Sequence, residues 1–166
     1  MLHALLATDD SRTRLVQRAV LGAVMFPHGA QKLLGWFGGY GWDGTLGYLT
    51  GAVGLPAPLA ALVILAESLG ALALVLGLGT RVVALGIAAV MVGAVVTTHL
   101  EAGFFMNWFG TQTGEGFEYH LLALALALPL VVAGGGAFSL DRVALRWLDR
   151  DASQARAHQP VSVRGI

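Results

Sequence analysis

The chain has 166 residues, of which 56% are hydrophobic and only 12% are charged. Globular domains carry about 25% charged residues, so this composition excludes a disordered chain and argues against a soluble domain. Ten basic and ten acidic residues give no net charge and no electrostatic support for a nucleic-acid partner. The lack of cysteine excludes disulfides, cysteine-ligated metal centres and thiol redox chemistry within this chain. We therefore expect a small membrane protein.

Four segments are long and apolar enough to span a membrane, which takes about 20 mostly apolar residues in a helix. In chain order they cover residues 15–36, 58–77, 82–100 and 117–133. The sequence thus predicts an all-α membrane protein, with a four-transmembrane-helix bundle over residues 14–134 after a cytoplasmic N-terminus of residues 1–13. Between the first two spans, Asp43 is expected to cap a short amphipathic helix.

A further amphipathic helix is expected over residues 135–150. The glycines at 134–136 end the fourth span, and Ser139 can cap a new helix. Beyond Ser139, apolar side chains and arginines lie on opposite sides at helical spacing, which is typical of an interfacial helix on the membrane surface. The polar segment 151–166 is expected to be a disordered cytoplasmic tail.

The basic residues are distributed very unevenly over the two predicted sides of the membrane. With the N-terminus inside, nine of the ten Lys and Arg residues lie on the inner side, and only Lys32 lies toward the outer side. The excess of Lys and Arg marks the cytoplasmic side of membrane proteins. We therefore expect both termini in the cytoplasm.

Ionisable residues within the predicted spans form the candidate site. A helix rises about 1.5 Å per residue, which places Glu67 near the midplane and His28 about 4 Å above it. By the same count, Lys32, His99 and Glu118 lie about 10–12 Å above the midplane, toward the outer side. A charge at the bilayer centre costs roughly 2.5–3.5 kcal/mol, so we interpret the cluster as a polar pocket or proton path. The alternatives are packing pairs that set helix register, or interfacial groups that face water.

Eleven of the fourteen aromatic residues lie on the predicted outer side. An aromatic belt at the headgroups is one explanation, but a belt would occupy both faces. The other is a lid over a lipophilic pocket, for which the candidates are Trp36, Tyr40, Trp42 and Trp108. No metal site is expected, because Glu118 and His120 lack the spacing of di-iron bundles. A haem between His28 and His99 is also disfavoured, since their estimated heights differ by about 8 Å.

Small residues recur at a spacing of four in the last three spans. This spacing permits close contact between helices, within one chain or in a homo-oligomer. The pairs are Ala66 and Gly70, Ala84 and Ala88, Ala89 and Gly93, and Ala123 and Ala127.

Several motifs in order along residues 14–141 resemble the DoxX family of small bacterial and archaeal four-helix membrane proteins. In chain order they are Phe26-Pro27-His28-Gly29 with Lys32, Leu55-Pro56-Ala57-Pro58, Glu67, Gly77-Leu78-Gly79-Thr80-Arg81, His99, Glu118, and Gly134-Gly135-Gly136-Ala137-Phe138-Ser139-Leu140-Asp141. The family usually has Pro where Gly135 stands, a minor departure because Gly also ends a helix. The family takes its name from a subunit of a terminal quinol oxidase and thiosulfate:quinone oxidoreductase system.

The resemblance implies a multi-pass protein of the bacterial cytoplasmic (inner) membrane with a redox association. The leading hypothesis is a membrane subunit of a quinone-linked oxidoreductase assembly, with the bilayer and other protein subunits as partners. The outer polar cluster would bind a quinone head group or relay its protons. The alternatives are a non-enzymatic anchor or stabilising partner of soluble redox enzymes, and a small lipophile or ion carrier. The lack of a redox-active residue or cofactor motif favours a subunit over a complete enzyme.

Overall fold

The computed structural model describes residues 2–157, with the backbone alone at 151–153 and 155–157. The described part is entirely helical and contains no strand. Its elements are α1 (Leu2–Leu6), α2 (Arg12–Leu34), a 3-10 turn (Trp36–Gly38), α3 (Gly41–Gly51), α4 (Ala57–Leu76), α5 (Thr80–Ala94) with a π-helical continuation (Val95–His99), α6 (Glu118–Ala133) and α7 (Leu140–Ala157).

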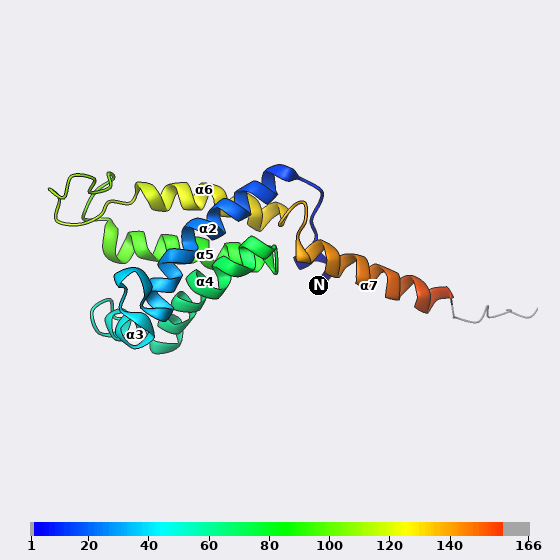
Figure 1. Ribbon diagram of the computed structural model, residues 1–166, viewed down its shortest axis with the longest axis horizontal. Helices are drawn as coiled ribbons and strands as arrows, with labels where there is room; N and C mark the ends of the chain where they lie inside the picture. Colours follow the sequence, from blue (N-terminus) through cyan, green and yellow to red (C-terminus); the bar gives the residue numbers. More distant parts are fainter. Residues whose placement is uncertain (1, 158–166) are drawn as a thin grey trace, which may run out of the picture.

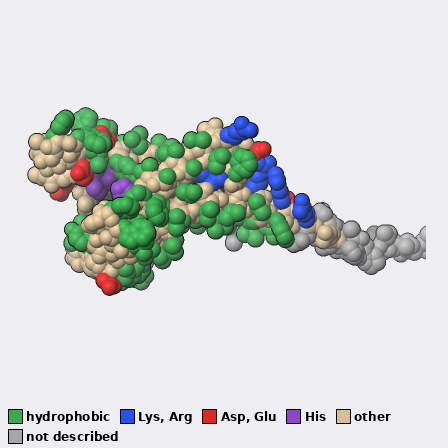
Figure 2. Space-filling view, viewed as in Figure 1, with side chains coloured by type: hydrophobic (Ala, Val, Ile, Leu, Met, Phe, Trp, Pro, Cys, Tyr) green, Lys and Arg blue, Asp and Glu red, His purple; other side chains and the backbone are tan. Residues whose placement is uncertain are grey.

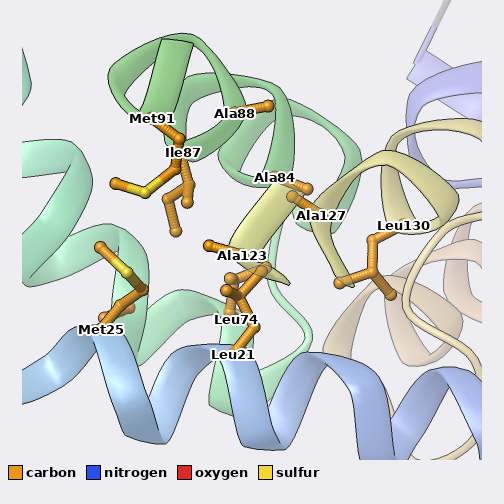
Figure 3. Packing of buried hydrophobic residues seen from close by; sticks show 11 residues of the cluster. Leu21, Met25, Leu74, Ala84, Ile87, Ala88, Met91, Ala123, Ala127 and Leu130 are labelled. Carbon is orange, nitrogen blue, oxygen red and sulfur yellow. The ribbon is translucent and has the colours of Figure 1, made fainter. Parts of the chain in front are cut away.

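Four of these helices, α2, α4, α5 and α6, pack side by side and form what we call the helical body (Figure 1). Each contributes to one apolar core, in which Leu21, Leu74, Ile87 and Leu130 are fully buried (Figure 3). By length and composition, α4 and the continuous helix Thr80–His99 could each cross a membrane, and α6 is a shorter apolar helix. All four helices lie within a few residues of the predicted spans.

Two glycines bring α2 directly against α4. A Cβ atom on Gly29 would lie 2.2 Å from the carbonyl oxygen of Glu67, and one on Gly22 would lie 2.7 Å from that of Ala71. Real Cβ atoms do not approach other atoms so closely, so only glycine fits at these two positions. The contact brings the turn of α2 that follows Gly29 alongside Glu67.

Arg18, near the start of α2, is 1% exposed and ties together three segments that are distant in the sequence. Its guanidinium donates hydrogen bonds to five backbone carbonyl oxygens. They belong to the end of α4 and to the segment after α6: Leu74, Val75, Gly135, Ala137 and Phe138. A helix end leaves such carbonyls without partners, so one buried cation satisfies several of them. In the sequence Arg18 counts only toward the predicted orientation, and no local pattern indicates this structural role.

Two further side chains close the same end of the helical body. The carboxylate of Asp141 accepts hydrogen bonds from the backbone N–H groups of Gly79 (2.6 Å) and Thr80 (2.9 Å), where α5 begins. Arg81 donates to the carbonyl oxygens of Ala7 and of the last turn of α6. These bonds fix the tight connection between α4 and α5.

Helix α7 extends beyond the end of the helical body, as Figure 1 shows. The hydroxyl of Ser139 accepts a hydrogen bond from the backbone N–H of Arg142 (3.2 Å), which confirms the expected cap. The side chain of Arg142 also binds Asp10, and this hydrogen bond holds the pKa of Asp10 below its ordinary value. The helix continues to Ala157, past the expected boundary at 150, and residues 158–166 of the expected tail lie outside the described part.

Two local predictions differ from the structure. The short helix α3 forms where it was expected, but Asp43 lies in its first turn, and Tyr40 stands at the cap position without a side-chain cap bond. The small residues of α4 and α5 also differ in how closely the neighbouring helix approaches them. A Cβ on Gly70 would lie 3.1 Å from Val83, whereas nothing lies within 4 Å of one on Gly93. The two helices therefore touch near their connection and separate further along, so the close contact expected at Ala89 and Gly93 is not formed.

Candidate functional site

A cavity of about 730 Å³ lies where α4 and α5 separate. Helices α2 to α6 and the π-helical turn all contribute to its wall. Small-molecule sites in proteins measure about 300–1,000 Å³ and are mostly apolar with a few polar groups, and this cavity fits that description. Figure 2 shows histidine side chains in a recess between two lobes at the end of the molecule opposite α7.

The central polar contact of the cavity joins α2 to α4. The ammonium Nζ of Lys32 lies 2.5 Å from Oε2 of Glu67, and both side chains line the cavity. The Glu67 side chain is 6% exposed and that of Lys32 is 28% exposed, so the pair has a buried and an accessible partner. The close approach of the two backbones at Gly29 brings the side chain of Lys32 within reach of the Glu67 carboxylate. The buried carboxylate of Glu67 needs its cationic partner, whereas the more accessible Lys32 depends less on Glu67.

A second group of polar side chains lies beside the ion pair. The ring of His28 lies 5.5 Å from that of Tyr119 on α6, measured between centroids. The hydroxyl of Tyr119 donates a hydrogen bond to the sulfur of Met25 (3.2 Å). These three residues line the cavity too. Tyr119 was not among the predicted site residues, because a tyrosine near a span end also fits an aromatic belt.

Two histidines close the wall between α5 and α6. The rings of His99 and His120 lie 4.3 Å apart, and Nδ1 of His99 is 2.8 Å from the carbonyl oxygen of Glu115. His120 is 6% exposed, and within the described residues its Nδ1 makes no hydrogen bond of normal geometry. Buried polar atoms normally have a hydrogen-bond partner, so this nitrogen is available to a group that enters the cavity.

The structure brings four of the five predicted polar residues to one cavity. His28, Lys32, Glu67 and His99 all line it. Glu118 does not: as the first residue of α6, it accepts a hydrogen bond from the indole Nε1 of Trp108 (3.2 Å) in the preceding loop.

The predicted aromatic lid does not cover the cavity. Trp36, Tyr40, Trp42 and Trp108 are absent from its wall, and three of them are more than half exposed. The turn after α2 lies back against that helix, since a Cβ on Gly39 would meet the backbone of Gln31 at 2.3 Å. In this arrangement Trp36 and Tyr40 are exposed and do not line the cavity. Tyr48 on α3 is the aromatic residue of the first loop region that does line the cavity.

The described residues contain no group of three or more His, Cys, Asp or Glu side chains that could hold a metal ion. The wall offers a paired ammonium and carboxylate, a second carboxylate, three imidazoles, two phenols and two threonine hydroxyls around a mostly apolar space. Such a set can donate hydrogen bonds to carbonyl oxygens and can exchange protons with them.

Comparison with known proteins identifies the family. The DoxX family model matches residues 13–100, which is more than half of the chain. The chain belongs to the DoxX family. The match runs from α2 to the end of the π-helical turn and includes both Lys32 and Glu67. DoxX proteins are membrane-associated, in agreement with the two apolar helices of sufficient length.

Among curated proteins, this DoxX chain is similar to one from Bacillus subtilis (strain 168) named "Putative oxidoreductase CatD". The two are 29% identical over 127 residues, which cover 76% of this chain and 83% of the relative. No solved structure matches the chain.

Proposed function

We propose that this DoxX protein is a membrane subunit of a quinone-linked oxidoreductase assembly and that its cavity binds the quinone head group. The observation that carries the proposal is the Lys32–Glu67 pair, 2.5 Å apart, in the wall of a mostly apolar cavity of about 730 Å³. The name of the relative, an oxidoreductase, supports a redox role.

In this proposal α2, α4, α5 and α6 each cross the bacterial inner membrane as a four-transmembrane-helix bundle. Helix α2 has 23 residues and α6 has 16, which correspond to lengths of about 34 Å and 24 Å. The hydrocarbon core of a bilayer is about 30 Å thick, so α6 reaches across with the help of its flanking residues. Both termini would lie in the cytoplasm, at the end of the molecule where Figure 2 shows the Lys and Arg side chains gathered.

The residues of the cavity suit a quinone. Its carbonyl oxygens accept hydrogen bonds, which the ammonium of Lys32 and the imidazole of His28 can donate. Quinone reduction takes up two electrons and two protons. The electrons would come from a reduced flavin or metal cofactor of a partner subunit, and the protons would pass through this chain, with Glu67 as the carboxylate that binds and releases them. The apolar walls would exclude bulk water from that exchange.

Co-purification tests this proposal. The protein would be purified in mild detergent, its quinone extracted and quantified per mole of residual lipid, and partner chains identified by mass spectrometry. We expect quinone and a redox enzyme to accompany the native chain. Gly93→Phe should remove the quinone, because Gly93 lines the cavity and has nothing within 4 Å of its Cβ position. Gly47→Phe on α3 is the matched control, equally uncrowded but outside the cavity wall.

Quinone bound equally to the native chain and to Gly93→Phe would contradict the proposal. So would native protein that carries no quinone above its lipid background.

A second candidate function is a non-enzymatic anchor for soluble redox enzymes. The observation in its favour is α7, which extends beyond the helical body with Val143 (48%) and Trp147 (64%) exposed. Under this alternative, the co-purified enzyme is lost when α7 is deleted, and no quinone accompanies the chain.

A further inference from the structure

A second hollow continues the cavity along the side of the helical body. It is a groove of about 370 Å³ between α4 and α5, and it runs from the cavity toward their connecting turn. Leu62, Ala66 and Gly86 belong to both the cavity wall and the groove, so the two spaces adjoin. Further along, the groove is lined by Leu69 of α4 and Val82 of α5, which are 55% and 57% exposed. The groove therefore faces outward, to the side of the helices.

The ionisable groups lie in only one of the two adjoining hollows. The ionisable side chains, including Lys32 and Glu67, line the cavity, whereas the described residues that line the groove are all apolar. A ligand with a polar head group and an apolar tail fits this arrangement, with the head group in the cavity and the tail in the groove. From Ala66 to Ala73 the groove follows eight residues of α4, which is about 10 Å of helix.

Gly86 stands where the cavity meets the groove. A Cβ at this position would meet only the Cβ of Ala66, at 3.9 Å, which is ordinary contact. The glycine is therefore not required for helix packing here. A larger side chain at this position would stand where the two hollows adjoin.

We propose that the quinone of the preceding section enters sideways from the lipid, between α4 and α5, and that its aliphatic tail lies in the groove past Gly86. This inference rests on the proposed quinone site and assigns the ligand its route and orientation. The head group is oriented toward Lys32 and Glu67, and the tail points along α4 toward Ala73. A passage through the lipid-facing side needs no opening to water and keeps an insoluble substrate within the membrane throughout.

Photolabelling tests the orientation. The probe is a decyl quinone, in benzoquinone and naphthoquinone forms, whose tail ends in a diazirine. The protein is reconstituted in lipid nanodiscs, illuminated and mapped by mass spectrometry, with excess unlabelled decyl quinone as competitor. We expect competed insertion within residues 65–73 and 82–86, at least fivefold above that in the competed sample.

A matched pair of glycine variants tests the passage. Gly86→Leu should reduce the labelling of the groove at least fivefold, because the new side chain fills the junction. Gly47→Leu on α3 should label as the native chain does, since nothing lies within 4 Å of its Cβ position and the residue lies outside both hollows. Thermal stability of each variant verifies that it is folded.

The outcomes separate the two proposals. Competed label in the loops at 36–55 or 101–117 would overturn the groove while leaving the quinone site in place, because the tail would then point out of the opposite end. Labelling of the groove that Gly86→Leu leaves unchanged would overturn the passage. No competed label anywhere would overturn the quinone site and the groove together.

Discussion

Lys32 and Glu67 form the residue pair on which the proposed chemistry depends. We expect Glu67→Gln to fold and insert normally, because the amide can still accept a hydrogen bond from Lys32, yet to lose most of the quinone-reductase activity of its membranes. Lys32→Met should cause a similar loss, since it breaks the same charge balance from the other side. Activity is measured in isolated membranes alongside thermal stability in detergent.

Glu101→Gln is the control for this pair, because Glu101 is exposed and lies outside the cavity wall. Full activity of Glu67→Gln would show that Glu67 does not carry protons and that the ion pair serves helix packing alone.

Arg18 is the residue whose loss should destabilise the fold most directly. Arg18→Met leaves five buried or part-buried carbonyl oxygens without their donor. Each unsatisfied buried group costs about 1–3 kcal/mol, so we expect a fall in thermal stability far larger than for Arg12→Met. Arg12 is in the first turn of the same helix and is exposed. Equal melting temperatures for the two variants in detergent would show that the carbonyls are satisfied in another way.

Gly29 sets the distance between α2 and α4. Gly29→Ala should destabilise the protein by about 1–3 kcal/mol, because the added methyl group overlaps the backbone of Glu67 and forces the helices apart. The same shift should weaken quinone binding by moving Lys32. Gly47→Ala, which meets nothing within 4 Å, should leave both properties near native. Chemical denaturation in detergent measures the first effect, and quinone content after purification the second.

At the scale of elements, α7 carries a prediction about the membrane surface. We expect its exposed apolar face to lie in the lipid interface, with Trp147 at headgroup level. The chain has no cysteine, so single cysteines at 147 and 149 can each carry a spin label without background. A label at 147 should be protected from water-soluble quenchers, and one at 149, on the opposite side of the helix, should be accessible. Equal accessibility would mean that α7 projects into water, as the anchor function requires.

The helices could be predicted from the sequence because apolar length and the Gly and Pro residues at their ends are local signals. The gathering of His28, Lys32, Glu67 and His99 also followed from the sequence, since a regular rise per residue converts position into depth. The role of Arg18 could not be predicted from the sequence, because its hydrogen-bond partners are backbone carbonyls of distant segments.

The failed aromatic lid has a different cause. The direction of a loop side chain depends on turn geometry, and the turn after α2 includes Phe37 at a φ of 53°. No periodicity in the sequence predicts such a turn. Likewise, small residues at a spacing of four mark either a close helix contact or a gap, and only the structure distinguishes Gly70 from Gly93.

At the scale of the whole molecule, the basic side chains are distributed unevenly. They gather at the α7 end, together with some acidic ones, as Figure 2 shows for one face. We therefore expect alkaline phosphatase fused after Arg150 to be inactive and a fusion within residues 38–44 to be active, because the enzyme works only outside the cytoplasm. The reverse pattern of activities would show that the protein has the opposite orientation, with the cavity toward the cytoplasm.

The central claim is that a quinone head group lies beside the Lys32–Glu67 pair. Its most direct test is a decyl quinone with an azide on the ring, photolysed with the native protein in nanodiscs and mapped by mass spectrometry. The account predicts insertion within residues 28–32 of α2 and 63–67 of α4 that excess unlabelled quinone suppresses and that Gly93→Phe abolishes while Gly47→Phe does not. Insertion that no competitor suppresses, or that maps to the exposed aromatic loops at 36–40 and 104–109, would contradict it.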